Sequence, residues 1–138
     1  MFWYWRLTLL ISFSILVISC RNRASTTDNE LLVPEDFMIF YDRFHSDSAY
    51  QMEHIIFPLA GVPAYDSLRT EDWSWEKEQW VLHRTFDDRG GTFRRNWYNV
   101  NSVIIEKISD SSDRFTMERR WVKMGGEWQL IYYKEMGF

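Results

Sequence analysis

An acid, an arginine and a tyrosine in the last third of the chain have the clearest potential for chemistry. Successive side chains of a strand point to opposite faces of the sheet. In strands, this alternation places Glu106, Arg119, Tyr132 and Lys134 on the same face as Trp121. A charge that faces a core is unfavourable unless it is paired or hydrated. We therefore expect either a pocket in which these side chains orient a polar ligand, or a cross-strand ion pair that reaches the edge of the sheet.

Other catalytic signatures are weak. The three histidines are far apart in the sequence, and Glu53-His54 lacks the second histidine of a helical zinc motif. Both Gly-Gly pairs fit turns better than a phosphate-binding loop, and no nucleophile elbow is present. The net charge of -4 provides no basic field for nucleic acid. We expect no catalytic residue, no metal site, no cofactor and no nucleic-acid partner.

Cys20, the only cysteine, directly follows an apolar segment near the start of the chain. The run from Leu7 to Ile18 follows Arg6 and is too short to span a bilayer comfortably, but it suits a signal peptide. Its end, Val17-Ile18-Ser19-Cys20, resembles the lipobox of bacterial lipoproteins. This resemblance implies that residues 1–19 are removed and that Cys20 carries lipid. An ordinary signal or an uncleaved anchor with an incidental cysteine is the alternative.

Acyl chains on Cys20 would hold the protein at a lipid bilayer, and the resemblance implies the bacterial outer membrane. Residues 20–31 are polar and without periodicity, which predicts a flexible tether before a single domain over residues 32–138. The tether begins with basic residues, so no acidic signal for surface export is evident. The periplasmic and cell-surface faces both stay open, as does the oligomeric state.

Apolar periodicity predicts helices before strands. Pro34 to His45 predicts a helix with an aromatic stripe, and the segment Ser46-Asp47-Ser48 offers an N-cap for a shorter helix that ends near Glu53. Further along, the expected elements are a strand at 55–59 ended by Pro58 and Gly61, a short helix at 71–79, a strand at 80–86, a turn at 87–91, and strands at 92–98, 101–109, 114–124 and 127–136.

Two turns set the expected register of the last three strands. A two-residue loop at Gly125-Gly126 and a four-residue turn at Asp110–Asp113 predict the following facing pairs. These are Trp121 with Leu130, Arg119 with Tyr132, Phe115 with Met136, Ile108 with Phe115, and Ile104 with Arg119. Helices followed by a run of strands predict an α+β fold, in which the N-terminal helices pack on one side of a curved antiparallel sheet.

The segment EDFMIFYDRFHSDSAYQMEHIIFPLAG resembles an uncharacterised family of Bacteroidetes lipoproteins, a domain of unknown function. That family is similar to the nuclear transport factor 2-like fold, a cone of helices over a bent sheet. The end of the chain, GEWQLIYY, looks like the family's last strand. The matching residues of the first segment are Phe40, Phe44, Ser46, Asp47, Ser48, Gln51, Ile55, Phe57, Pro58 and Leu59. The resemblance implies a fold and a compartment but no reaction.

These observations favour a non-catalytic, membrane-anchored binding domain of the cell envelope. Its partner would be an envelope protein, a glycan or a small molecule. Trp73, Trp75 and Trp80 could rim an apolar groove for a protein or glycan. The alternative is a small hydrolase or isomerase that uses Glu106 or His83 as an acid or base in the cone.

Overall fold

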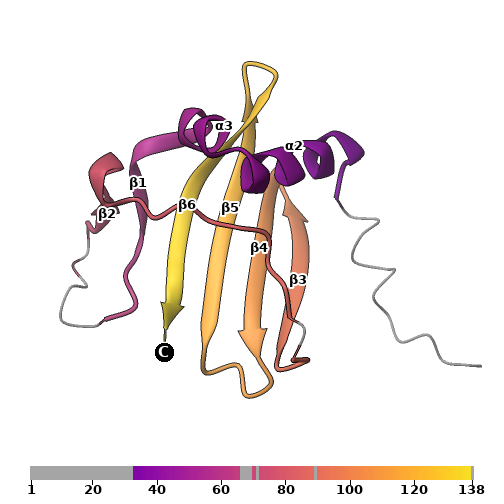
Figure 1. Ribbon diagram of the computed structural model, residues 1–138, viewed down its shortest axis with the longest axis vertical. Coiled ribbons are helices and arrows are strands. Elements are labelled where there is room, and N and C mark those ends of the chain that lie inside the picture. Colours follow the sequence, from indigo (N-terminus) through magenta and orange to yellow (C-terminus); the bar gives the residue numbers. More distant parts are fainter. Residues whose placement is uncertain (1–32, 66–69, 71, 89, 138) are drawn as a thin grey trace, which may run out of the picture.

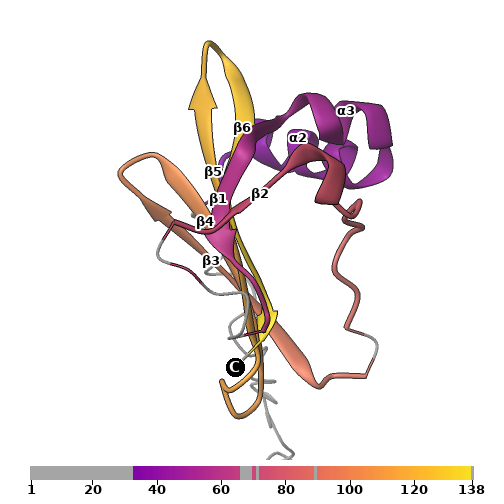
Figure 2. The same ribbon diagram turned by 90° about the vertical axis from the view of Figure 1, so that its left-hand side faces the viewer.

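The structure, a computed structural model, describes residues 33–65, 70, 72–88 and 90–137. The predicted signal peptide, the tether and Cys20 lie outside the described residues. Helices α2 (Glu35–Ser46) and α3 (Ser48–Glu53) lie against one face of a six-stranded sheet (Figures 1 and 2). The strands are β1 (Ile55–Val62), β2 (Ser74–Trp75), β3 (Phe93–Val100), β4 (Val103–Asp110), β5 (Thr116–Met124) and β6 (Glu127–Gly137). Within the described residues, no helix has the length and apolar character needed to cross a membrane.

The sheet is mixed, which corrects the predicted antiparallel sheet. Its strand order is β2-β1-β6-β5-β4-β3, and β1 pairs with β6 in parallel while the other neighbours are antiparallel. The parallel pair arises because α3 ends at the same end of the sheet as the β5–β6 hairpin (Figure 1). Both strands therefore start at that end, where the Leu130 amide donates to the carbonyl of His54 at 2.8 Å.

The predicted helices and their aromatic stripe are confirmed. Pro34 is the N-cap of α2, and the Asp47 carboxylate caps α3 by accepting from two backbone amides. The stripe packs around Trp121, which is fully buried on the sheet. Four rings of α2 lie within 4.8–6.0 Å of the Trp121 ring, namely those of Phe37, Phe40, Tyr41 and Phe44. Aromatic side chains therefore fill the space between α2 and the sheet.

The predicted register of β5 and β6 is correct only near the turn. Trp121 faces Leu130 as expected, but a bulge at Ile131 then shifts the pairing. Arg119 consequently faces Tyr133 instead of Tyr132. A second irregularity places Thr116 opposite Gly137, so the predicted Phe115–Met136 pair does not form.

The β4–β5 turn lies one residue later than predicted. Asp110 is still paired, because its amide donates to the Phe115 carbonyl and its carboxylate accepts from the Phe115 amide, both at 3.1 Å. The register therefore moves by two residues, which keeps the predicted faces. Ile108 faces Met117 and Ile104 faces Trp121, in place of the predicted pairs with Phe115 and Arg119.

The middle of the chain departs most from prediction. Strand β1 continues through Pro58 and Gly61 to Val62, and the predicted helix at 71–79 is the short strand β2 followed by a 3₁₀ helix at Lys77–Gln79. Residues 80–88, expected to hold a strand, have no regular structure. This segment, which we call the strap, descends on the helix side of the sheet towards β3 (Figure 2).

Candidate functional site

Four polar side chains from α2, β4 and β5 form a buried network between the helices and the sheet. The hydroxyl of Tyr41 donates to Glu106 Oε1 at 2.7 Å, and Arg119 Nε lies 2.9 Å from Glu106 Oε2. Arg119 Nη1 lies 2.5 Å from His45 Nε2. Glu106 and Arg119 face each other across β4 and β5, and their side chains are only 0% and 3% exposed. The ion pair is therefore internal and does not reach the edge of the sheet.

The network fixes the protonation of His45. Arginine can only donate, so His45 Nε2 must accept from Arg119, and Nδ1 carries the proton that it donates to the Tyr41 carbonyl at 2.8 Å. Burial, reinforced by the charge of Arg119, lowers the pKa of His45 to about 3. Burial also raises the pKa of Tyr41 above its ordinary value, and the Glu106 carboxylate adds to this effect.

Gln51 of α3 holds the strap against the helices. Its amide nitrogen donates to the carbonyls of Phe44 and His83 at 2.7 and 2.8 Å. Its amide oxygen accepts from the His83 backbone amide at 2.8 Å and from the Trp80 indole at 3.1 Å. Gln51 is 1% exposed. One side chain therefore supplies hydrogen bonds that a sheet partner would otherwise give the strap.

An open cavity of about 370 Å³ lies between the strap and the sheet. It is lined by Leu82, His83, Arg84, Phe86, Ile108, Met117, Arg119, Tyr133 and Met136. His83 Nδ1 is buried and has no hydrogen-bond partner in the described part of the chain. Burial lowers the pKa of His83 to about 3, and the charge of Arg119 contributes. The site thus joins an apolar wall to an unsatisfied ring nitrogen and a guanidinium.

The two depressed histidine pKa values predict acid sensitivity. Between about pH 6.5 and pH 3 the unfolded chain binds protons at His45 and His83 that the native protein does not bind. We therefore expect the free energy of unfolding to be highest above pH 6.5 and to fall with pH, by up to about 1.4 kcal/mol per unit for each histidine. Urea unfolding from pH 7.5 to pH 4 measures the slope. The variant His83→Gln should have a shallower slope, and an unchanged slope would contradict this assignment.

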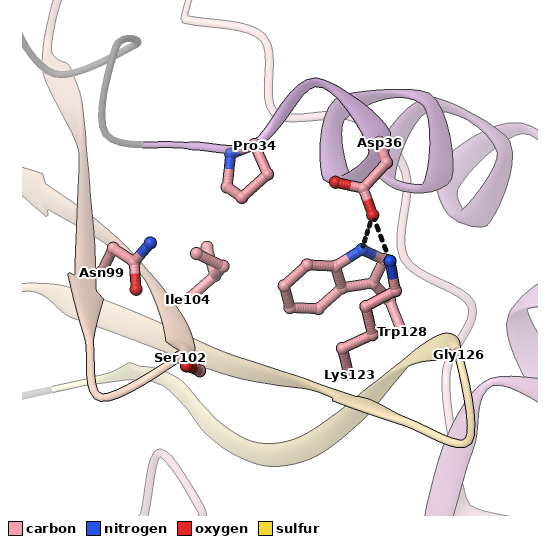
Figure 3. A pocket seen from close by; sticks show the side chains of 8 residues that line it. All are labelled: Pro34, Asp36, Asn99, Ser102, Ile104, Lys123, Gly126 and Trp128. Carbon is pink, nitrogen blue, oxygen red and sulfur yellow. Dashed lines mark hydrogen bonds and ion pairs between the residues drawn. The ribbon is translucent and has the colours of Figure 1, made fainter.

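A second hollow, of about 570 Å³, lies beside the start of α2 (Figure 3). Asp36 accepts hydrogen bonds there from Lys123 at 2.7 Å and from the Trp128 indole at 3.1 Å. The Lys123 amine is also 5.9 Å from the centre of the Trp128 ring. Asp36, Lys123 and Trp128 therefore already satisfy one another, unlike the His83 ring nitrogen of the strap cavity.

The structure brings together three of the four predicted pocket residues. Glu106, Arg119 and Trp121 lie on the inner face, whereas the bulge turns Tyr132 to the other face, where the Arg120 guanidinium stacks on its ring at 4.2 Å. Tyr133 occupies the inner position instead. The Lys134 amine donates to the Thr116 hydroxyl at 2.9 Å and does not join the network.

Sequence reasoning missed Tyr41, His45 and Gln51 as members of the polar interior. Tyr41 and His45 are one helical turn apart on the buried stripe, so the phenol and the imidazole both needed partners inside the fold. That requirement was a usable signal, because the polar groups expected on the facing sheet included those of the Glu106–Arg119 pair. Gln51 gave no comparable signal, since its two bonds to the strap backbone reach a residue 32 positions away.

The tryptophans of the middle segment contact β6 and α3 in the described part of the chain. The Trp75 indole donates to the Tyr133 carbonyl at 3.2 Å, and its ring meets that of Trp73 edge-on at 5.7 Å. Trp80 packs against Tyr133 at 5.4 Å and bonds Gln51. In the described ranges, no group of three or more His, Cys, Asp or Glu residues could hold a metal ion.

Comparisons with solved structures identify the fold. A nuclear transport factor 2-like protein from Bacteroides fragilis shares 16% identity with this chain at a TM-score of 0.52, over 74% of this chain and 47% of that one. A protein from Bacteroides uniformis, solved by NMR, shares 20% identity at a TM-score of 0.52, over 73% and 76% of the two chains. The chain thus matches about half the length of the B. fragilis protein. No family model and no curated protein matches the sequence.

Proposed function

We propose that this chain is a lipid-anchored protein of the bacterial cell envelope whose nuclear transport factor 2-like domain binds a small molecule without transforming it. The observation that carries the binding role is the strap cavity with the unpartnered His83 Nδ1 in its wall. A buried polar atom without a partner is unfavourable, and a bound ligand would satisfy it. The volume lies within the range of small-molecule sites.

The composition of the wall supports a small ligand over a protein or a glycan. Ile108, Met117 and Met136 provide an apolar surface that could enclose a hydrocarbon or aromatic group. His83 and Arg119 provide polar contacts that would fix its orientation. A few convergent polar groups on an apolar wall are the usual composition of a small-molecule site.

The state of the titratable groups argues against acid-base catalysis. A general base works best with a pKa near the working pH, and burial holds the pKa of both His45 and His83 at about 3. Glu106 is engaged by Tyr41 and Arg119 and lies behind the cavity wall. These contacts favour binding over the hydrolase or isomerase alternative.

Methionine methyl groups offer a direct test of binding. Met117 and Met136 line the cavity, whereas Met124 is 45% exposed at the far hairpin and Met38 lies on α2. The full chain in lipid nanodiscs can be titrated with a fragment collection of anionic, neutral and cationic compounds. We expect the ¹³C-methyl signals of Met117 and Met136 to shift, and those of Met124 and Met38 to stay unchanged. Conversion of a bound fragment into a product would instead support an enzyme, and shifts of Met124 or Met38 alone would place binding elsewhere.

The anchoring role rests on Cys20 and the apolar segment before it. We expect the protein extracted from bacterial membranes to begin at Cys20 and to carry acyl chains, because two or more chains are needed for stable attachment. Mass spectrometry of the extracted protein, and fractionation of the outer membrane, measure both. The variant Cys20→Ser should keep its first nineteen residues. An unmodified Cys20 thiol in the wild-type protein would end the lipoprotein proposal.

A further inference from the structure

We infer that the strap cavity selects an amphipathic anion: a small molecule with a carboxylate at one end and an apolar body. This inference rests on the proposed binding function and names the class of ligand. It follows from the distribution of charge around the cavity and from the apolar wall opposite that charge.

Among the described residues, the cavity wall carries positive charge and no carboxylate. Arg84 and Arg119 both line it, and its other described residues are neutral. Glu106 compensates Arg119 from behind the wall at 2.9 Å. Arg84, on the exposed strap, has no ion pair with any carboxylate within the described residues. The cavity therefore has one uncompensated guanidinium at its mouth.

Arg95 adds to this positive potential from β3. It faces Ile108, itself part of the cavity wall, across the β3–β4 ladder. Its guanidinium lies over the Trp97 ring at 5.3 Å, and no carboxylate among the described residues forms an ion pair with it. Among the described residues, the only acid that forms an ion pair with any of these three arginines is Glu106. Positive charge at the rim of a low-dielectric pocket favours an anion.

A carboxylate would complete contacts that the protein leaves open. Its two oxygens could accept from Arg84 at the mouth and from the imidazole of His83, which is neutral and can donate from Nδ1 as one tautomer. The body of the ligand would then meet Ile108, Met117 and Met136. A neutral isostere keeps the apolar contacts but leaves Arg84 without a counter-ion, and a cation is repelled.

A matched pair of probes tests the charge preference. 4-Phenylbutyrate and 4-phenylbutyramide share a shape and differ in charge, and both can be titrated against the full chain in nanodiscs with empty nanodiscs as a blank. We expect the carboxylate to bind about tenfold more tightly or better, judged by the Met117 and Met136 methyl shifts. Salt should weaken the binding of the carboxylate more than that of the amide.

Two arginine variants separate the cavity from general surface charge. Arg84→Gln should bring the affinity for the carboxylate close to that for the amide. Arg94→Gln, whose arginine already pairs with Asp113 at 2.6 Å, should leave the preference intact. Equal affinities of the two probes for the wild-type protein would overturn the charge inference while leaving the binding function in place. The absence of any shift at Met117 and Met136, with these probes and with the fragment collection, would overturn both.

Discussion

Replacing Arg119 by methionine is expected to lower the free energy of unfolding by about 3–5 kcal/mol. The loss arises because the Glu106 carboxylate, fully buried, would keep only the Tyr41 hydroxyl as a partner. His45 Nε2 would lose its donor at the same time. Such a loss is a large part of the total stability of a domain of this size. Urea denaturation followed by tryptophan fluorescence measures it.

Two further variants show whether the orphaned charge is the cause. Glu106→Gln introduced together with Arg119→Met removes both charges and keeps an amide oxygen for Tyr41, so the double variant should be more stable than Arg119→Met alone. Arg120→Met removes the neighbouring arginine, whose partly exposed pair with Glu118 should contribute less than about 1 kcal/mol. Additive losses in the double variant would mean that packing, not charge, dominates at this site.

Replacing Gln51 by leucine is expected to cost about 3 kcal/mol or more and to release the strap. The change removes the partners of the His83 amide and carbonyl, the Trp80 indole and the Phe44 carbonyl. Each buried polar group left without a hydrogen bond costs about 1–3 kcal/mol. Water that reaches these groups when the strap moves would form new hydrogen bonds and reduce this cost.

Amide hydrogen exchange distinguishes this local release from general destabilisation. The His83 amide should exchange slowly in the wild-type protein and much faster in Gln51→Leu, while the amides of β4 and β5 change less. Gln129→Leu, on the outer face of β6, is a matched control that should affect neither stability nor exchange strongly. Protection of the His83 amide in Gln51→Leu would mean that other contacts hold the strap.

The helix stripe was predictable because its period is a local property. Phe37, Phe40, Tyr41 and Phe44 recur at the spacing of one helix face, and burying that face required no knowledge of the partner. The inward direction of Glu106 and Arg119 followed in the same way from alternation along a strand. A register error of two residues did not disturb this, because an even shift preserves the face.

The bulge at Ile131 was not predictable from alternation. One extra residue in β6 exchanges the faces of the residues between the bulge and the second irregularity, so Tyr133 replaces Tyr132 and Lys134 leaves the inner face. The residue type does not indicate which of Tyr132 and Tyr133 faces inwards, because a tyrosine suits either face equally well. Only the packing of the completed sheet distinguishes them.

The predicted strand at residues 80–86 was wrong for a different reason. Trp80, Leu82, Arg84 and Phe86 alternate as a strand would, but the backbone of His83 bonds the side chain of Gln51 instead of a neighbouring strand. Alternation reports which side chains share a face and not what the backbone pairs with. The parallel pairing of β1 with β6 was not predictable from alternation either, because it joins segments about 75 residues apart.

That parallel pair also bears on when the domain can form. Strand β6 lies inside the sheet, between β1 and β5, so β1 and the short β2 have no partner in the main sheet until residues 127–137 are available. Contacts between such distant segments slow folding. The sheet therefore stays incomplete until about 75 residues after the start of β1 have been made, which suits a polypeptide that we propose is threaded unfolded through a translocation channel before it folds on the far side.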